Sequence, residues 1–337
     1  MKERVDTSKQ TIHFYLPQQE QVELLAKADP DRDWRLFSTG VQVWVGQTYL
    51  RLRQLGMNVH LSSVAPRRGI VVTHADYVPQ LLESNWWPAS LIVVAARADR
   101  PPNRYAECEI VQNASGADGR RIHYVHHWPQ PGLIGRDPAR ADVIRTVAYK
   151  GMMGEMGESF KDQAWFDFIQ SSSLSWQCDA TVWQGNGQVS YQEVAWNDYS
   201  AVDLIVAIRK DTASLYPRKP ASKLINAWAA GVPAILGPEQ AYRELRSSPL
   251  DYIEATTAEE VASAIARLRS DPQQYRAMVE NGLRRASQFS ADNCALRWRE
   301  ILEQAVPAHS NGFAARLARL ANQGLRFRLA RLRQRSV

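Results

Sequence analysis

The stretch "RKPASKLINAWAAGVPAILGPE", residues 218–239, decides the fold of the second half of this 337-residue chain. It begins with basic residues and continues as a segment of small and apolar residues. Gly231-Val232-Pro233 interrupts this segment, and an apolar run follows. Pro220 favours a helix that begins near Ser222, and the glycine favours the end of that helix. The stretch therefore predicts a helix followed by a buried strand, with Lys223 in the first helical turn.

Short apolar segments alternate with amphipathic segments on both sides of this stretch. "TIHFYLP" (11–17) and "GIVVTHADYV" (69–78) in the first half, and "VIRTVAYKG" (143–151) and "DLIVAIRK" (203–210) in the second, are typical of buried strands. Helical patterns separate them, and strands that alternate with helices form βαβ units around a mainly parallel sheet. We therefore predict an α/β protein.

"WPQPGLIGRDPAR" (128–140) interrupts the alternation with three prolines and two glycines. Such a segment favours a linker between domains. We predict two Rossmann-like, doubly wound domains that face a cleft, residues 1–140 and 141–305. A basic, amphipathic helical tail, residues 306–337, follows them.

The net charge of +6 is concentrated in this tail. Residues 311–337 contain seven arginines and no Asp, Glu or Lys, so the rest of the chain is close to neutral. A neutral body argues against a nucleic-acid partner. Two apolar stripes run through the tail, and they predict an interfacial helix for an anionic membrane surface; a helix packed on the first domain and a disordered basic tail remain alternatives. The stripes are Phe313, Leu317 and Leu320, then Leu325, Leu329 and Leu332.

The cysteines and the N-terminus indicate the compartment. Cys108, Cys178 and Cys294 are far apart, odd in number and without metal-ligand spacing, which favours reduced thiols. The N-terminus has no apolar segment of a secretory signal, and no run is long enough to span a bilayer. We expect a cytoplasmic protein, peripheral on the inner face of the membrane if the tail binds lipid.

Basic residues gather where the first turn of the helix at Ser222 meets the preceding strand end. Arg209 follows the apolar run "DLIVAI", and Lys219 and Lys223 flank the helix start. A lysine in the first turn opposes the helix dipole by a few tenths of a kcal/mol, whereas an anion there is favoured. These residues, with Ser222, predict a diphosphate site; a solvated basic loop is the alternative.

A second candidate loop follows the strand at 143–151. "YKGMMGEMGESF" (149–160) has glycines in GxxGxxG spacing, which is not the dinucleotide-binding fingerprint. Glycine lets a backbone approach a ligand closely. We predict that Gly151 lies against a bound phosphate and that Lys150 contacts it; an ordinary strand-to-helix turn is the alternative.

The segment "SKLINAWAAGVPAILGPEQAYREL" (222–245) resembles the nucleotide-binding segment of GT-B glycosyltransferases of the family 4 type. The resemblance implies a metal-independent transferase without a cofactor, which moves a sugar from a nucleotide-sugar to a glycan or lipid-linked acceptor. The C-terminal domain would hold the donor and the N-terminal domain the acceptor. Where the family pattern has two glutamates, this chain has Asn226, at the ribose position, and Arg218, at the sugar position. These departures keep two alternatives open: a sugar-nucleotide epimerase of the same fold, and a non-catalytic nucleotide- or carbohydrate-binding protein.

Histidines at strand ends are the candidate catalytic bases. His126 and His127 follow the strand-like "RIHYV", and His74 is two residues from Asp76. The resemblance implies that a histidine after a late strand of the first domain lines the cleft; a structural histidine is the alternative at both places. Alternation along a strand separates His126 from His123 and His127, and no cysteine is near, so we predict no metal site.

Overall fold

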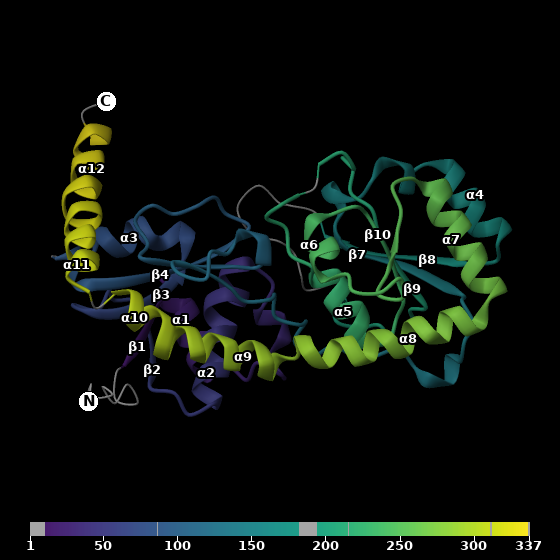
Figure 1. The fold of residues 1–337 in the computed structure, drawn as a ribbon. Coiled ribbons are helices and arrows are strands. Elements are labelled where there is room, and N and C mark those ends of the chain that lie inside the picture. The colour runs from purple at the N-terminus through teal and green to yellow at the C-terminus, as the bar shows by residue number, and fades with distance from the viewer. Residues whose placement is uncertain (1–10, 86, 182–193, 215, 311, 336–337) are drawn as a thin grey trace. The chain divides into compact units, whose positions relative to one another are not determined.

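The computed structural model describes residues 11–85, 87–181, 194–214, 216–310 and 312–335. The chain forms two compact units, the first made of residues 1–126 and 291–337 and the second of residues 127–290. Each unit contains a parallel sheet with helices, and a helical segment closes the chain (Figure 1). The predicted α/β class with two Rossmann-like domains is confirmed. The segment "CDATVWQ" (178–184) also predicts a strand, and its residues 182–184 lie outside the described ranges.

The first unit is built on a six-stranded sheet of order β2-β1-β3-β4-β5-β6, in which every pair is parallel. The central strand β4 is an apolar run that is buried along most of its length, as a parallel strand covered on both faces should be. The strands are β1 (Ile12–Tyr15), β2 (Val59–Ser62), β3 (Gly69–His74), β4 (Leu91–Ala98), β5 (Cys108–Val111) and β6 (Ile122–Tyr124).

Helices from both ends of the chain cover this sheet. The π-helical segment Gln42–Gln47 continues into α2, and the helix ends before Gly56, whose φ of 75° is the left-handed conformation typical of a glycine that follows a helix. The α-helices are α1 (Gln19–Lys27), α2 (Thr48–Gln54), α3 (Val78–Glu83), α9 (Ala291–Glu300), α10 (Val306–Ser310), α11 (Phe313–Arg319) and α12 (Phe327–Arg335).

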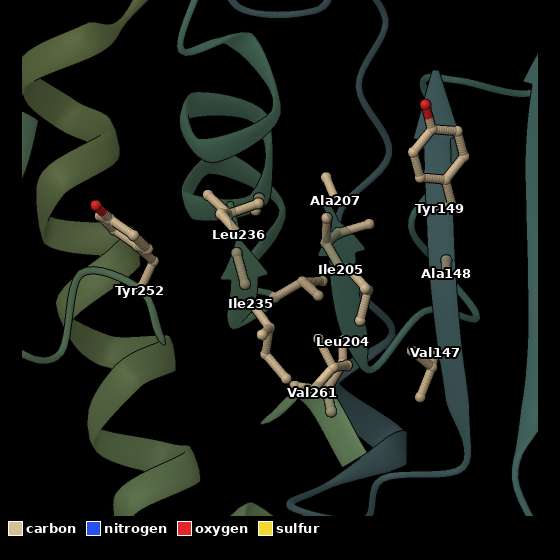
Figure 2. Packing of buried hydrophobic residues seen from close by; sticks show 14 of the residues in the cluster. Val147, Ala148, Tyr149, Leu204, Ile205, Ala207, Ile235, Leu236, Tyr252 and Val261 are labelled. Atoms are coloured by element: carbon tan, nitrogen blue, oxygen red, sulfur yellow. The ribbon is translucent and has the colours of Figure 1, made fainter. Parts of the chain in front are cut away.

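The second unit is built on a five-stranded parallel sheet of order β11-β10-β9-β7-β8. Figure 2 shows its central strands side by side, with branched side chains between them and the Tyr149 hydroxyl directed toward the carboxyl end of β7. The strands are β7 (Thr146–Met152), β8 (Ser175–Thr181), β9 (Leu204–Ala207), β10 (Ala234–Leu236) and β11 (Ile253–Glu254).

The opening stretch folds as its pattern predicts. Helix α5 runs from Ser222 to Ala230, Gly231 caps it at a φ of 68°, and β10 follows directly. Five apolar residues of α5 are buried in the core of the unit. The other helices of this unit are α4 (Gln163–Ser171), α6 (Gln240–Leu245), α7 (Ala258–Ser270) and α8 (Pro272–Ala286).

The observed units differ from the predicted boundaries at residues 140 and 305. The proline-rich segment 128–140 is part of the second unit, where Arg136 donates to the buried carboxylate of Asp203 at 2.9 Å. Helix α9 belongs to the first unit, where the Trp298 ring lies 6.4 Å from that of Trp44. Helix α9 therefore packs on the unit that is more distant in sequence, whereas residues 128–140 pack on the unit that follows them directly in the chain.

The tail folds as a helix of the first unit. Arg319 forms an ion pair with both oxygens of Glu107, and Gln323 donates to the Tyr105 carbonyl at 2.9 Å. Phe327 is buried, and its ring lies edge-on to that of Tyr105 at 5.2 Å. Figure 1 shows α11 and α12, in yellow, beside α3 and β4. A helix packed on the first domain was one of the alternatives left open, and lipid binding by its outer face stays a prediction.

Candidate functional site

A cluster of charged side chains lies at the carboxyl ends of the strands of the second unit. Arg209 follows β9 and Glu239 follows β10, while Glu155 ends a short 3₁₀ turn directly after β7. Lys223 is in the first turn of α5. In open α/β sheets this edge is where ligands bind, since loops and helix N-termini converge there.

Arg209 is the centre of the cluster, only 8% exposed. Its Nη1 pairs with the Glu155 carboxylate, and its Nε lies 2.9 Å from Oε2 of Glu239, which is 2% exposed. The other oxygen of Glu155 pairs with Nζ of Lys219 at 3.0 Å. Glu155 thus bridges two cations, and Glu239 holds Arg209 from the side of β10.

The electrostatics of the cluster favour an anionic ligand. Burial alone would raise the pKa of Glu155, but the positive charges of Arg209, Lys223 and Lys219 lower it to about 2. Burial, and then the charge of Arg209, lower the pKa of Lys223 to about 8, although Glu239 and Glu155 counter the shift. A bound phosphate would bring further negative charge to Lys223 and would favour its charged form.

Tyrosines form the walls of the cluster. The Arg209 guanidinium lies 5.0 Å from the ring centre of Tyr216, and Nζ of Lys223 lies 5.8 Å from that of Tyr149. The buried hydroxyl of Tyr242 has no hydrogen-bond partner among the described residues, and burial raises its pKa well above the usual value. Aromatic faces stabilise the cations where little water reaches them.

Gly151 lies against this cluster, and Ser222 begins the helix that carries Lys223. A side chain at Gly151 would meet the Tyr149 hydroxyl at 3.0 Å and the end of Lys223 at 3.1–3.3 Å, so only glycine leaves Lys223 where it is. Ser222 begins α5, and no side chain caps that helix end. The structure therefore brings together Gly151, Arg209, Lys219, Ser222 and Lys223 from the predicted set.

Lys150 is placed differently from the prediction. Its side chain is buried, forms an ion pair with Asp179 on the neighbouring strand β8, and donates to the Ala195 carbonyl at 3.0 Å. Its Nζ also lies over the Tyr199 ring, 4.9 Å from the centre. Along a strand successive side chains point to opposite sides, so Lys150 and Tyr149 diverge. A phosphate contact by Lys150 would first require the loss of a buried ion pair, and we no longer expect it.

The two positions that depart from the family pattern differ in their surroundings. The Asn226 amide oxygen accepts from the Gln130 backbone N–H at 2.9 Å, and the amide shares a hydrogen bond with Tyr199. Arg218 is exposed on the loop before α5. Asn226 is therefore held within the unit, which limits how it can meet a ribose, while Arg218 is accessible.

The candidate bases in the first unit include one confirmed contact. Nδ1 of the buried His74 lies 3.4 Å from a carboxylate oxygen of Asp76, and it accepts from the Asp76 backbone N–H. Burial lowers the pKa of His74, and Asp76 partly offsets this. Arg100 binds the Asp76 carboxylate through three contacts of 2.9–3.0 Å. Arg100 therefore competes for the carboxylate that a histidine base would use.

The other two histidines lie on either side of the unit boundary. His126 is the last residue of the first segment of unit 1, and its carbonyl accepts from the Cys294 thiol at 3.5 Å. His127 begins the second unit, half-buried, with Nδ1 2.7 Å from the Trp128 carbonyl. Strand β6 ends at Tyr124, so both histidines follow it, as predicted. Their catalytic role stays a prediction.

Two observations concern metals and membranes. Across the described ranges, no three His, Cys, Asp or Glu side chains gather in a way that could hold a metal ion. None of the helices in the described part of the chain combines the length and the apolar character that spanning a bilayer requires.

Two acidic residues of the cluster escaped the sequence analysis. Glu155 lies in the glycine loop after β7, and Glu239 closes the quoted stretch. Both residues follow the carboxyl end of a strand, as Arg209 does. This position in the sequence pattern would have been enough to predict them as members of the cluster. Only their contact partners required the structure.

The chain was compared with known proteins. Residues 158–303 match a family model described as glycosyl transferase-like. None of the curated proteins compared with the chain matches it.

Solved structures match over most of the chain at low identity. HepE from Anabaena in complex with UDP and glucose is 15% identical, covers 87% of this chain and 99% of its own, and has a TM-score of 0.51. The same protein in complex with UDP is 14% identical, covers 87% of this chain and 99% of its own, and has a TM-score of 0.53. Sucrose-phosphate synthase from Thermosynechococcus elongatus is 13% identical, with 89% and 100% coverage and a TM-score of 0.53. These matches show the fold.

Proposed function

We propose that this chain transfers a sugar from a nucleoside-diphosphate-sugar, since residues 158–303 match the glycosyl transferase-like family model and the chain shares the GT-B fold. The observation that carries the proposal is the convergence of three cations on one sheet edge. In the proposed reaction Arg209, Lys219 and Lys223 would lie beside the diphosphate leaving group, and neutralising its developing charge would lower the barrier to transfer.

The structures that share this fold support the choice of donor. HepE binds UDP, and one of its complexes also contains glucose. UDP is therefore the first probe for this chain. Thermal stabilisation by a panel of nucleoside diphosphates and nucleotide-sugars tests the donor site, because a ligand that binds only the native state raises Tm with its concentration. No stabilisation by any member of the panel would refute the donor site.

We propose that the cations act without a divalent metal. Three positive side chains supply the charge that a metal ion would otherwise bring to the diphosphate. Donor binding and turnover should then be unchanged after EDTA treatment. Activity that disappears with EDTA and returns with Mg²⁺ or Mn²⁺ would contradict this part of the proposal.

Two other functions remain distinguishable by experiment. A sugar-nucleotide epimerase would release an isomerised sugar without an acceptor, and a non-catalytic binder would leave the donor intact. Incubation of the chain with each nucleotide-sugar, followed by analysis of both the sugar and the nucleotide, separates the three. Slow donor hydrolysis to nucleoside diphosphate supports the transferase.

For the acceptor we propose a glycan or a lipid-linked sugar, with the chain bound to the inner face of a membrane. The support is the outer face of the tail helix. Its six large apolar residues are 38–79% exposed, although its inner face packs on the first unit. The π-helical segment Leu320–Arg326 brings the two stripes together, since a π-turn spans one more residue than an α-turn and Leu320 and Leu325 are five residues apart.

The docking proposal is tested with the full chain, because the tail contributes Phe327 to the core. Leu317→Gln with Leu325→Gln removes two exposed members of the stripe and leaves the packed face intact. Flotation with anionic vesicles should fall, whereas Val64→Gln, which changes a more exposed apolar residue elsewhere in the first unit, should have no effect. Equal flotation of all three proteins would refute docking through this face.

A further inference from the structure

An elongated groove in the first unit lies between the tail helix and the segments that flank β5. Its volume is about 1120 Å³. One wall is formed by residues 104–107 and 120–121, and the other by residues 312–330 of the tail together with His309. The groove is separate from the charged cluster described above, which lies in the second unit.

The lining of the groove is strongly basic. It contains five arginines and one glutamate. That glutamate, Glu107, is already bound by Arg319, and Arg121 pairs with the buried Glu109 at 3.0 Å. No carboxylate among the described residues pairs with the side chain of Arg104, Arg120 or Arg326, so the groove has an excess of positive charge that an anionic ligand would neutralise.

The lining also contains apolar residues, and these continue onto the exposed face of the tail. Four alanines of the tail and Leu329 complete the wall. Leu329 is 55% exposed and is also a member of the apolar stripe. A ligand with an anionic head in the groove could therefore extend an apolar chain past Leu329 along the stripe.

We infer that this groove binds the phosphate head of a membrane amphiphile while its chain lies along the leucine stripe. Arginine is suited to phosphate because its planar group donates two parallel hydrogen bonds. Arginines that have no carboxylate partner among the described residues lie on both walls, and such a pair of walls suits a compact phosphate better than a diffuse negative surface. The inference rests on the proposed membrane docking and deepens it by naming the headgroup chemistry.

The test reverses charge on the body wall alone. Arg104→Glu with Arg120→Glu changes two exposed side chains and leaves the tail unaltered. Arg67→Glu with Arg68→Glu, exposed in the connection between β2 and β3, is the matched control with the same change of net charge. Melting temperatures of both variants establish that each is folded.

Binding is measured with phosphatidylcholine vesicles that contain either phosphatidic acid, which has a terminal phosphate, or phosphatidylglycerol, which does not. The content of each anionic lipid is chosen so that the two kinds of vesicle have the same surface potential. The wild type should prefer phosphatidic acid, and the groove variant should lose this preference, with binding weaker by roughly 25-fold, since each basic side chain near an anionic surface is worth about 1 kcal/mol, or fivefold. The control should keep the preference.

The outcomes separate this inference from the proposals it rests on. No binding to either kind of vesicle refutes membrane docking, whereas equal binding to both by wild type and groove variant refutes the groove alone. Inorganic pyrophosphate tests whether the groove binds free phosphate. If pyrophosphate displaces the chain from phosphatidic acid vesicles at equal phosphate concentration, the site takes free phosphate and the assignment to a lipid is overturned. None of these measurements depends on donor binding in the second unit.

Discussion

The substitution Lys223→Met tests the diphosphate site most directly. Methionine keeps most of the length of the side chain in the first turn of α5 and removes its charge. A hydrogen bond from a charged group contributes about 1.5–3 kcal/mol, so UDP binding should weaken by about 10- to 150-fold in isothermal titration calorimetry. An unchanged affinity would refute the assignment of Lys223 as a diphosphate ligand.

The same variant should alter the pH dependence of binding. The pKa of Lys223 in the free protein is about 8, and a bound anion would raise it. Above pH 8 the free lysine is neutral and must take up a proton to bind, so wild-type affinity should be flat below pH 8 and fall above it, by up to about tenfold per pH unit. The phosphates of UDP remain ionised throughout this range. Lys223→Met should lose this fall, and a fall that persists would assign the titration to another group.

Stability should change in the opposite direction. The pKa of Lys223 is lowered from 10.5 to about 8, so the folded state disfavours the charged form by about 3 kcal/mol at neutral pH. Lys223→Met removes this penalty and should raise Tm by several degrees without ligand. In the wild type, stability from this group is smallest below pH 8 and increases between pH 8 and 10.5, where only the unfolded chain keeps the proton. A lower Tm for the variant would show that Lys223 stabilises the ligand-free protein, contrary to this reasoning.

Two further variants test the surroundings of the site, and a third tests the buried ion pairs at the opposite edge of the sheet. Glu155→Gln removes the carboxylate that occupies two of the cations, and UDP binding by calorimetry should tighten by about tenfold, whereas weaker binding would make Glu155 a donor ligand. Gly151→Ala should weaken UDP binding by about tenfold because the new methyl group displaces Lys223. The control Gly154→Ala, which has open space around it, should bind UDP as the wild type does. Equal loss of affinity in both variants would exclude displacement of Lys223 as the cause. Asp203→Ala leaves two arginines without their buried partner and should cost about 3–5 kcal/mol in urea unfolding, with a loss below 1 kcal/mol refuting the role of this carboxylate.

Local patterns in the sequence were sufficient for the architecture. The alternation of apolar runs and amphipathic segments predicted two parallel sheets, because burial on both faces requires continuous apolar strands. Pro220 and Gly231 predicted the limits of α5 through local backbone preferences. The position of Arg209 after a buried strand predicted that it would lie at the ligand-binding edge. Each of these inferences depends on interactions between residues close in sequence.

The tertiary structure alone decided which charges meet. Glu155 and Arg209 are 54 residues apart, and nothing in either segment identifies the other as its partner. The register of β7 against β8 places Lys150 beside Asp179, where it forms an ion pair and is not available to a ligand. A shift of one position along a strand reverses the direction of the side chain.

The same limit applies to the ends of the chain. The sequence by itself determined that the tail is basic and carries two apolar stripes, since composition and spacing are local properties. The structure decided that these stripes form one face, through the π-helical segment, and that α9 and the tail pack on the first unit. Such packing depends on shape and charge brought together from distant segments, and no local pattern contains that information.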